Sequence, residues 1–337
     1  MSVQSLFLDN ADMNKNDINQ APVDHERLIA DIGGTNARFA LLSSFGKVHQ
    51  QLVLPCADYA DIVSAAKAYL ALIDNPTIDE AAMAIANPIN GDWIKMTNHN
   101  WAFSIAETRG ALGLKKLTFK NDFAALAMSL PLLPDTDLKQ IGGVVKADKG
   151  SALAVLGPGT GLGVSGLVRA GDHWIPLEGE GGHVSVCPAN ERECDILKTC
   201  WKEYEHVSAE RLVSGMGLQN LYKAICELEG ADAEDLSPAE ISTRAKDNSD
   251  PYCAEALETF CGLLGAVAGN LVLTLGAFGG VYIGGGIVPR LGGYFETSPF
   301  RERFEAKGRF RGHLEQVPAF VIQAKHPALI GIGEAFK

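Results

Sequence analysis

The chain has 337 residues, of which 47% are hydrophobic and 21% are charged, so it is long enough for roughly two folded domains and too apolar to be disordered. Its formal net charge of −12 argues against a broad nucleic-acid surface and against an anionic membrane surface, because both require clustered lysine and arginine. The charge still allows nucleotide binding, since backbone amides and a metal ion hold a nucleotide locally.

The first 27 residues lack the basic start and the apolar centre of a secretory signal. Asp9, Asp12 and Asp17 make this stretch acidic, and Lys15 is its one lysine. We therefore expect residues 1–27 to form a mobile extension that precedes the folded chain.

Strands and helices alternate through the first third of the chain. Apolar runs predict strands at residues 27–42 (interrupted by a turn), 49–54 and 80–86, and helical spacing predicts helices at 58–72 and 106–112. The polar segment 97–101 either binds polar groups or is a turn with a buried Trp101. Strands mixed with helices throughout predict an α/β fold.

A glycine-rich turn interrupts the first strand pair, with the sequence Asp-Ile-Gly-Gly-Thr-Asn at residues 31–36. Glycine lets backbone N–H groups approach an anion closely, so this turn is able to hold phosphate oxygens. Asp31 would then lie near Mg²⁺, through water, because Mg²⁺ keeps most of its hydration shell. The alternative is an ordinary β-hairpin turn closed by glycines, and this motif alone favours the alternative.

Asn121 and Asp122 follow a short apolar run that begins at residue 117, and they precede a helix predicted at 123–130. Both residue types are preferred helix N-caps, which is the simplest interpretation of an isolated pair. A carboxylate here is also able to accept the proton of a substrate hydroxyl as its oxygen attacks a phosphoryl group. Together with a phosphate-binding turn, Asp122 suggests a kinase.

Two more glycine turns occur in the second half of the chain. Residues 157–163 separate strands predicted at 152–156 and 164–168, and residues 284–286 follow a strand predicted at 280–283. The turn at 157–163 matches neither G-x-x-x-x-G-K-[ST] nor G-x-G-x-x-G, because no lysine follows it and Leu162 replaces the third glycine. A strand leads into a Gly-Thr turn both here and at 31–35, which predicts two related lobes with a nucleotide between them.

Helical spacing also predicts helices near residues 208–225, 238–246 and 252–274. The stretch 259–289 carries no charge, which is compatible with a membrane span. Its many glycines, and its division into a helical and a strand-like part, favour a buried helix followed by a core strand.

Polar residues suited to a polyhydroxylated molecule occur between residues 178 and 210. Glu180 and His183 lie among three glycines, with a charged surface loop as the alternative interpretation. Glu210 is predicted to begin a helix, where it would otherwise complement the helix dipole.

Seven cysteines, an odd number without a disulfide framework, predict reduced thiols in a cytosolic protein. Cys187, Cys194 and Cys200 lie near His183 and leave a zinc site as an alternative, although no C-x-x-C pair is present.

As an ordered set, these segments resemble bacterial glucokinase, a hexokinase-like family of the sugar kinase/Hsp70/actin superfamily. The resemblance covers nearly everything from residue 28 to the end of the sequence. It rests on ADIGGTNAR at residues 30–38, MTNH at 96–99, NDF at 121–123, GPGTGLG at 157–163, EGGH at 180–183, SAER at 208–211 and GGGIVPR at 284–290.

The resemblance implies a glycolytic enzyme that phosphorylates D-glucose to glucose 6-phosphate with ATP and Mg²⁺, and it implies that Asp122 is the general base. It also implies that the following residues bind the sugar: Asn98, Asn121, Asp122, Glu180, His183 and Glu210. The nucleotide-binding residues implied are Ala30, Asp31, Ile32, Gly33, Gly34, Thr35, Asn36, Gly157, Gly159, Thr160, Gly161, Gly284, Gly285 and Gly286. Asp31 is in addition the implied magnesium residue, through water.

The fold implied is a two-lobed actin-like ATPase (ribonuclease H-like) fold with nucleotide and sugar in the interlobe cleft. Its small α/β domain would span residues 28–120 and be completed by a C-terminal helix at about 324–337, and its large α/β domain would span 121–323. The resemblance further implies a cytoplasmic homodimer with glucose and ATP as partners, and with neither nucleic acid nor membrane. Lobe closure on the sugar would exclude water and limit wasteful ATP hydrolysis.

Two alternatives stay open at this point. One is a kinase of another hexose. The other is a non-catalytic sugar-sensing regulator on the same fold, although residues 1–27 are too few for a helix-turn-helix domain. An actin- or chaperone-like ATPase is disfavoured, since it does not need the polar set of Glu180, His183 and Glu210.

Overall fold

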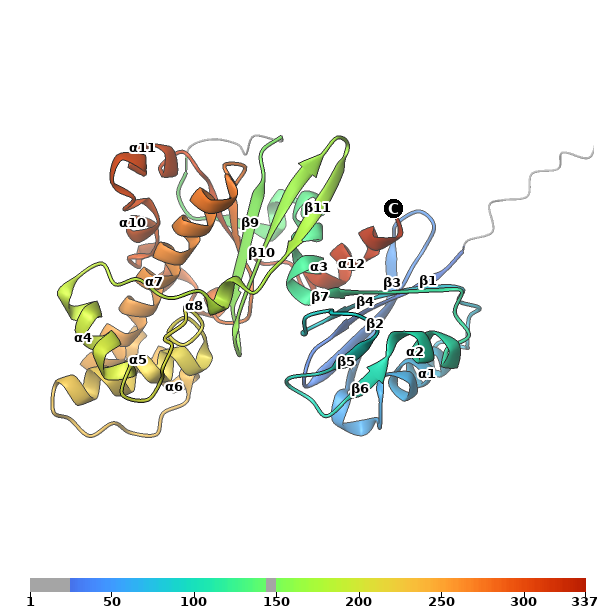
Figure 1. Ribbon diagram of the computed structural model, residues 1–337, viewed down its shortest axis with the longest axis horizontal. Helices are drawn as coiled ribbons and strands as arrows, with labels where there is room; N and C mark the ends of the chain where they lie inside the picture. The colour runs from blue at the N-terminus through green and yellow to red at the C-terminus, as the bar shows by residue number, and fades with distance from the viewer. Residues whose placement is uncertain (1–24, 144–149) are drawn as a thin grey trace, which may run out of the picture.

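The computed structural model describes residues 25–143 and 150–337, which form two α/β lobes (Figure 1). One lobe contains a five-stranded sheet and the other a six-stranded sheet, so the predicted α/β class is confirmed. Helices α3 (Asp122–Ser129) and α12 (Pro327–Ile332) lie where the lobes meet. Most of the predicted N-terminal extension lies outside the described residues, and Arg27 already begins the first strand.

The first lobe is built on a sheet with the strand order β3-β2-β1-β4-β7. β1 to β3 are antiparallel, whereas β4 and β7 run parallel to β1. The elements of this lobe are β1 (Arg27–Ile32), β2 (Asn36–Leu42), β3 (Val48–Pro55), α1 (Ile62–Leu72), β4 (Glu80–Ile85), β5 (Trp93–Lys95), β6 (Ala102–Ser104), α2 (Ile105–Ala111) and β7 (Lys116–Asn121).

The two faces of this sheet are covered by different helices. Leu28 and Ala30 share a core cluster with residues of α1, and Ile29 shares one with Leu329 and Ile332 of α12. This alternation follows from the two-residue period of a strand. A sheet covered on both faces needs continuous apolar strands, which is what β4 provides.

Helix α1 begins four residues later than predicted. The Asp61 side chain accepts a hydrogen bond from the Ser64 N–H at 2.6 Å, and the Ser64 hydroxyl in turn lies 3.1 Å from the Asp61 N–H. This reciprocal cap satisfies two backbone donors and sets the helix start at Ile62. The residues before it, Cys56–Asp58, form a separate 3₁₀ turn.

The second lobe is built on a sheet with the strand order β11-β10-β9-β12-β13-β8. Its strands are β8 (Leu138–Gln140), β9 (Leu153–Pro158), β10 (Leu162–Ala170), β11 (His173–Glu178), β12 (Val281–Ile283) and β13 (Ala319–Ile322). Its helices are α4 (Glu191–Cys200), α5 (Gly215–Leu228), α6 (Pro238–Lys246), α7 (Pro251–Leu275), α8 (Val288–Leu291), α9 (Gly293–Thr297), α10 (Phe300–Glu305) and α11 (Arg311–Leu314).

The two sheets repeat one topology. In each, three antiparallel strands joined as hairpins are followed by two strands parallel to the first, as β3-β2-β1-β4-β7 and β11-β10-β9-β12-β13. The strand β8 is an addition at the edge of the second sheet. This correspondence supports the two related lobes that the sequence predicts.

The uncharged stretch is a buried helix followed by a strand, as predicted. Asp250 caps α7, Pro251 is its first residue, and Gly276 ends it with a left-handed φ of 62°. By length and composition α7 could cross a membrane, but 67% of its most apolar window is buried inside the protein. It packs against α5, α6, α10 and β9 as a core helix.

The helix predicted at 208–225 begins only at Gly215, so the expected helix start at Glu210 is wrong. Ser214 caps α5 by accepting a hydrogen bond from the Gly217 N–H at 3.0 Å. The same hydroxyl donates to the Glu210 carbonyl at 2.7 Å, and the Glu210 N–H donates to the Gly182 carbonyl at 2.8 Å. Contacts to a distant segment therefore hold residues 208–214 out of the helix.

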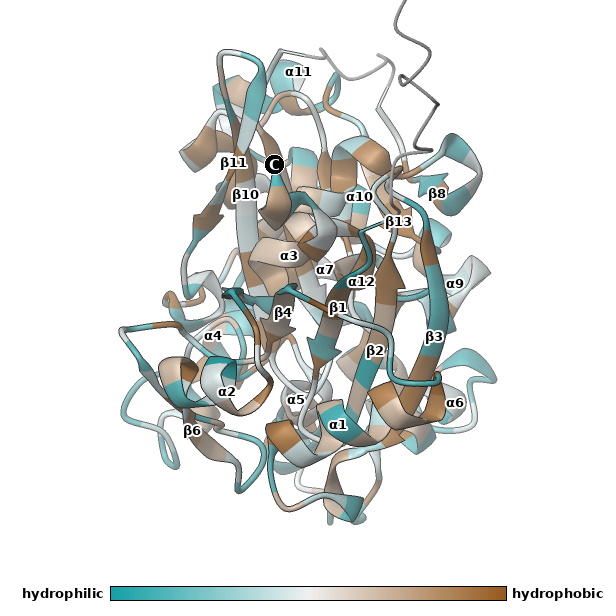
Figure 2. Cartoon of the chain, turned by 90° about the vertical axis from the view of Figure 1, so that its right-hand side faces the viewer, coloured by the Kyte–Doolittle hydropathy of each residue, from teal (hydrophilic) through white to brown (hydrophobic). Residues whose placement is uncertain are grey.

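Helix α12 lies directly beside α3, as Figures 1 and 2 both show. A Cβ at Gly331 would overlap the Ala125 carbonyl oxygen, so glycine allows this close approach. The C-terminal segment thereby contacts β1, β4 and α3 at once.

Candidate functional site

Asp122 is the first residue of α3 and follows directly after β7. The N-cap of the helix is Asn121, whose Oδ1 accepts hydrogen bonds from the N–H groups of Phe123 (2.9 Å) and Ala124 (3.2 Å). β1, β4 and β7 are parallel, so their carboxyl ends meet at one edge of the sheet. The register therefore brings Asp122 near the turn that follows β1.

The pKa of the Asp122 carboxyl group lies well above that of an ordinary carboxyl group. Burial, together with the negative charges of Asp31 and Glu180, raises the pKa of Asp122 to about 7, although hydrogen bonds from backbone N–H groups partly oppose this. Asp31, Asp122 and Glu180 come from three separate segments. The structure thus brings together three of the carboxylates that the sequence singled out.

The first glycine turn connects β1 and β2. The Gly33 N–H donates to the Asn36 carbonyl at 2.9 Å, and Arg38 Nη1 lies 3.2 Å from Asp31 Oδ2. Burial raises the pKa of Asp31, while Arg38 opposes that change. A Cβ at Gly34 would lie 2.6 Å from the carbonyl oxygen of Asn98, so only glycine lets this loop approach the turn so closely.

Asn98 is exposed and lies beside this turn. A pocket of about 470 Å³ opens next to it, lined by Ala57, Asp58, Tyr59, Ala60, His99 and Asn100. The Cys56 N–H donates to the Thr35 carbonyl at 2.8 Å, which holds the start of the lining segment 57–60 against the glycine turn.

The second glycine turn connects β9 and β10 and is shorter than predicted. The strands extend to Pro158 and from Leu162, so the turn proper is Gly159, Thr160 and Gly161. The Gly215 N–H donates to the Gly159 carbonyl at 2.8 Å. This hydrogen bond holds the start of α5 against the turn.

The third glycine turn touches the second. Because β12 runs parallel to β9, both reach the same edge of the sheet. A Cβ at Gly157 would lie 2.7 Å from the Gly284 carbonyl carbon and 2.8 Å from the Gly285 nitrogen. Gly285 itself has a φ of 76°, which favours glycine.

Glu210 lies against the second turn. Its Oε2 accepts a hydrogen bond from the Leu162 N–H at 2.8 Å, and a Cβ at Gly161 would overlap the same oxygen. The Glu210 carboxylate therefore stabilises the turn where it ends at Leu162. The sequence did not indicate this role.

Glu180 precedes a short 3₁₀ turn (Gly181–His183) whose last residue is His183, and both side chains are exposed. The His183 N–H donates to the Glu180 carbonyl at 3.0 Å, and His206 Nε2 lies 3.0 Å from the His183 carbonyl oxygen. The segment follows β11, whose last residue, Glu178, forms an ion pair with Lys120 of β7 at 2.7 Å.

No group of three histidine, cysteine or acidic side chains suited to a metal occurs in residues 25–143 and 150–337. The zinc alternative for Cys187, Cys194 and Cys200 therefore gains no support. A magnesium ion held through water needs fewer protein ligands. The buried carboxylate of Asp31, which pairs with Arg38 and has the Asp122 carboxyl group as a neighbour, fits such an ion.

His326 and Arg38 also belong to this site, although the sequence gave them no role. His326 caps α12 with a left-handed φ of 54°, and burial and the Arg38 charge lower its pKa, while Asp31 opposes that change. Arg38 Nε is buried and has no hydrogen-bond partner among the described residues. Only the return of the C-terminal segment reveals the proximity of His326, which lies almost 300 residues after Asp31.

The chain as a whole is similar to known sugar kinases. A family model described as Glucokinase matches residues 28–337. A glucokinase of Chromobacterium violaceum is 52% identical over 306 residues, covering 91% of this chain and 88% of the relative. One of Aromatoleum aromaticum is 52% identical over 315 residues, covering 92% and 94%. The crystal structure of a glucokinase from an Antarctic psychrotroph has a TM-score of 0.84 at 36% identity, covering 92% of this chain and 98% of that one. The two-lobed actin-like fold is thereby confirmed.

Proposed function

The chain belongs to the glucokinase family and phosphorylates glucose with ATP, and we propose that Asp122 is the general base of this reaction. The observation that carries the proposal is the position of the Asp122 carboxyl group, at the start of α3 beside two other carboxylates. Its pKa of about 7 suits a base that works near neutral pH.

In the proposed reaction, Asp122 accepts the proton of the glucose 6-hydroxyl group while that oxygen forms a bond to the γ-phosphorus of ATP. The bond from the γ-phosphorus to the oxygen that bridges to the β-phosphate breaks, and ADP leaves with its electron pair. Asp122 then returns the proton to solvent when the products leave. Positioning and charge stabilisation account for most of the catalysis in such a transfer.

The proposed sugar ligands are Asn98, Asn121, Asp122, Glu180, His183 and Glu210. Amide, imidazole and carboxylate groups are donors and acceptors suited to sugar hydroxyls. Exposure of Asn98, Glu180 and His183 supports this assignment, since they have polar atoms available for a ligand. Asn121 Oδ1 and one oxygen of Glu210 accept hydrogen bonds from backbone N–H groups, and Asn121 Nδ2 lies 3.5 Å from the Asn87 carbonyl oxygen. Their sugar contacts would therefore use the second Asn121 Nδ2 hydrogen and the other Glu210 oxygen.

The three glycine turns are the proposed nucleotide site. Residues 30–36 and the turn 159–161, with Gly157, would lie against the phosphates. The N–H groups of Gly33 and Gly159 already donate to the carbonyls of Asn36 and Gly161, so other N–H groups of these turns would bind the phosphate oxygens. Gly284, Gly285 and Gly286 would lie by the adenosine. The direct contact between Gly157 and the third turn supports a single continuous site.

A magnesium ion is proposed at Asp31, through water. When bound, it would neutralise charge on the phosphate oxygens of ATP. Asp31 would hold its hydration shell, and Arg38 would keep the Asp31 side chain in place through their ion pair.

We further propose the domain division that the sequence predicts, with residues 28–120 and the segment 324–337 in the small domain and 121–323 in the large one. The packing of α12 on β1 and β4 supports the return of the chain to the small domain. We also propose that the two domains close on the sugar. The protein would be cytoplasmic and would form a homodimer. The free cysteines support a reducing compartment.

The test is a coupled assay of ADP formation across a hexose panel, with the wild type and Asp122→Asn. We expect turnover on glucose, and a kcat about 10² to 10⁴ lower in the variant while calorimetry still detects glucose binding. The kcat/KM of the wild type should fall about tenfold per pH unit below pH 7. Near-normal turnover by homogeneous Asp122→Asn would rule out the proposed base.

A further inference from the structure

Gly157 and Gly163 are register partners across the β9–β10 hairpin, one pair away from Pro158 and Leu162, which close the turn. Two glycines opposite each other leave a gap in the surface of a sheet. The ring of Phe123 occupies this gap. A Cβ at Gly163 would overlap the ring, and one at Gly157 would lie 2.9 Å from Cζ.

The backbone of Phe123 contacts the proposed base. Its N–H lies 2.9 Å from Asn121 Oδ1 and 2.9 Å from Asp122 Oδ1. Phe123 therefore touches the Asp122 carboxylate through its backbone and the phosphate hairpin through its ring. The two contacts are made by one residue, although β7 and β9 belong to different sheets.

We propose that Phe123 is a positioning residue, whose ring in the gap between Gly157 and Gly163 fixes the separation of the Asp122 carboxylate from the turn Gly159–Gly161. This inference rests on the proposed function, because it takes Asp122 as the base and the turn as a phosphate site. Phe123 itself would contact neither the attacking hydroxyl group nor the γ-phosphate.

The chemistry makes this separation important. Phosphoryl transfer proceeds well only when the attacking oxygen lies about 3 to 3.5 Å from the phosphorus, and a displacement of about 1 Å costs roughly 10²-fold in rate. The base holds the hydroxyl and the turn holds the phosphate, so the residue between them sets their distance.

The first experiment compares Phe123→Leu with Phe320→Leu. Both rings are partly buried against the same hydrophobic cluster, but Phe320 lies on β13, where it stacks on Tyr282 at 5.0 Å. We expect Phe123→Leu to lower kcat about 10- to 10²-fold, counted per glucose site measured by calorimetry, with glucose affinity within about threefold of the wild type. We expect kcat of Phe320→Leu within about twofold.

The second experiment uses the glycine opposite the ring. Gly163→Ala alone should displace the ring and lower kcat by a similar factor. In a Phe123→Ala background the added methyl group has space, so the same substitution should cause no further loss. If Phe123→Ala does not fold, the comparison of Phe123→Leu with Gly163→Ala still applies, because both should lower kcat with little change in glucose affinity.

Equal losses in Phe123→Leu and Phe320→Leu, or a loss of glucose affinity that matches the loss of kcat, would overturn the inference. So would additive effects of Phe123→Ala and Gly163→Ala. Asp122→Asn, assayed in parallel, distinguishes a failure of this inference from a failure of the proposed function. If that variant is inactive while Phe123→Leu behaves like its control, the inference fails alone. If Asp122→Asn is active, the proposed general base is wrong and the inference fails with it.

Discussion

Asp122 lies where an ionised carboxylate is costly. Burial and the charges of Asp31 and Glu180 all act against the charged form, and the pKa of Asp122 rises from 3.8 to about 7. The property that would suit this residue to proton transfer is therefore unfavourable for folding. Such conflicts between stability and activity are common at active sites.

We expect Asp122→Asn to raise the Tm of the ligand-free protein, and by more at pH 8 than at pH 5. A carboxyl group whose pKa is raised in the folded protein contributes stability in its protonated form. This contribution is fully present below the unfolded-state pKa of 3.8 and is lost as the pH rises through the folded-state pKa of about 7. Each pKa unit corresponds to about 1.4 kcal/mol. Thermal unfolding at both pH values checks this, with the exposed Asp172→Asn as control. An equal gain at the two pH values would contradict the prediction.

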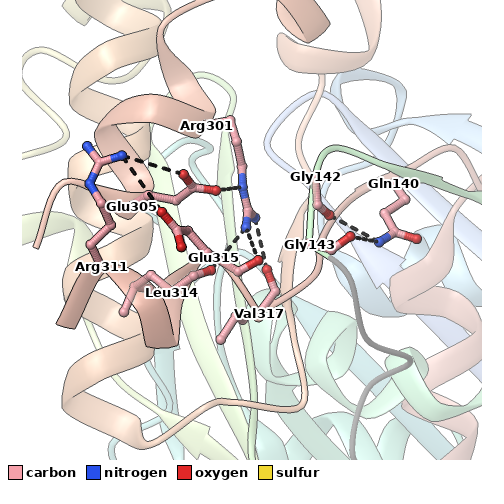
Figure 3. A network of polar contacts seen from close by, with 9 residues as sticks. All are labelled: Gln140, Gly142, Gly143, Arg301, Glu305, Arg311, Leu314, Glu315 and Val317. Carbon is pink, nitrogen blue, oxygen red and sulfur yellow. Dashed lines mark hydrogen bonds and ion pairs between the residues drawn. The ribbon is translucent and has the colours of Figure 1, made fainter.

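Arg301 of α10 holds together three segments of the second lobe (Figure 3). Its guanidinium group donates to the carbonyl oxygens of Leu314, Glu315 and Val317 at 2.9 to 3.1 Å, and its Nε donates to Glu305 at 2.5 Å. A Cβ at Gly142 would lie 2.6 Å from the Arg301 Nε, so the side chain also packs under the turn after β8.

We expect Arg301→Met to lower the free energy of unfolding by about 3 kcal/mol, because three carbonyl groups and the largely buried Glu305 carboxylate lose their donor. Arg311→Met is the matched control, since Arg311 reaches Glu305 and Glu315 only at 4.0 Å. Urea unfolding would measure both, and kcat at 25 °C should stay unchanged. Similar losses in the two variants would contradict this role.

At the scale of elements, the hairpin β9–β10 is supported on several sides. Glu210 binds the Leu162 N–H, the start of α5 binds the Gly159 carbonyl, and the third glycine turn lies against Gly157. A glycine turn with this little conformational freedom is preorganised, so less entropy is lost when it binds phosphate.

We expect Glu210→Ala to raise the KM for ATP as well as the KM for glucose, each by about tenfold, because a charge-assisted hydrogen bond to the turn is lost. Glu210→Gln keeps an acceptor for the Leu162 N–H, so it should change mainly the KM for glucose. Initial-rate kinetics with both substrates varied would separate the two effects. An unchanged KM for ATP in Glu210→Ala would show that the turn does not need this bond.

At the scale of the whole molecule, one ion pair joins the two sheets directly beside the site. Lys120 precedes Asn121 and Asp122, and Glu178 lies two residues before Glu180. The Lys120 and Glu178 side chains are 33% and 39% exposed, so salt screens the pair and its worth is about 0.2 to 1 kcal/mol. An interaction of this size biases the relative position of two lobes without fixing it.

We expect Lys120→Gln and Glu178→Gln to change glucose affinity by less than about fivefold, in the same direction, with no added effect in the double variant. The affinity of the wild type should depend on salt, and that of the variants should depend on it less. Calorimetry at low and high salt tests this. Lys115→Gln is the control, because its pair with Asp79 also measures 2.7 Å but lies within one lobe. Unchanged salt dependence in the variants would contradict the prediction.

Local sequence determined the features that depend on neighbours in the chain. The glycine turns at 33–34 and 284–286, the strands that precede them and the buried helix α7 follow from glycine placement, apolar runs and caps such as Asp250 and Pro251. The ordered set of motifs also identified the family. Helix starts were less certain, since Asp61 and Ser214, rather than the apolar pattern, set where α1 and α5 begin.

Only the tertiary structure decided how these segments act on one another. The pKa of Asp122 depends on Asp31 and Glu180, which are distant in the chain, and the Glu210 carboxylate binds an N–H group 48 residues away. His326 and Phe123 join the site through packing between elements. Burial and contacts across lobes set these properties, and neither is encoded in any short stretch of sequence. The sequence by itself therefore determined the glycine turns, the strands before them and the family. The tertiary structure decided the pKa values of the site residues and how far apart they lie.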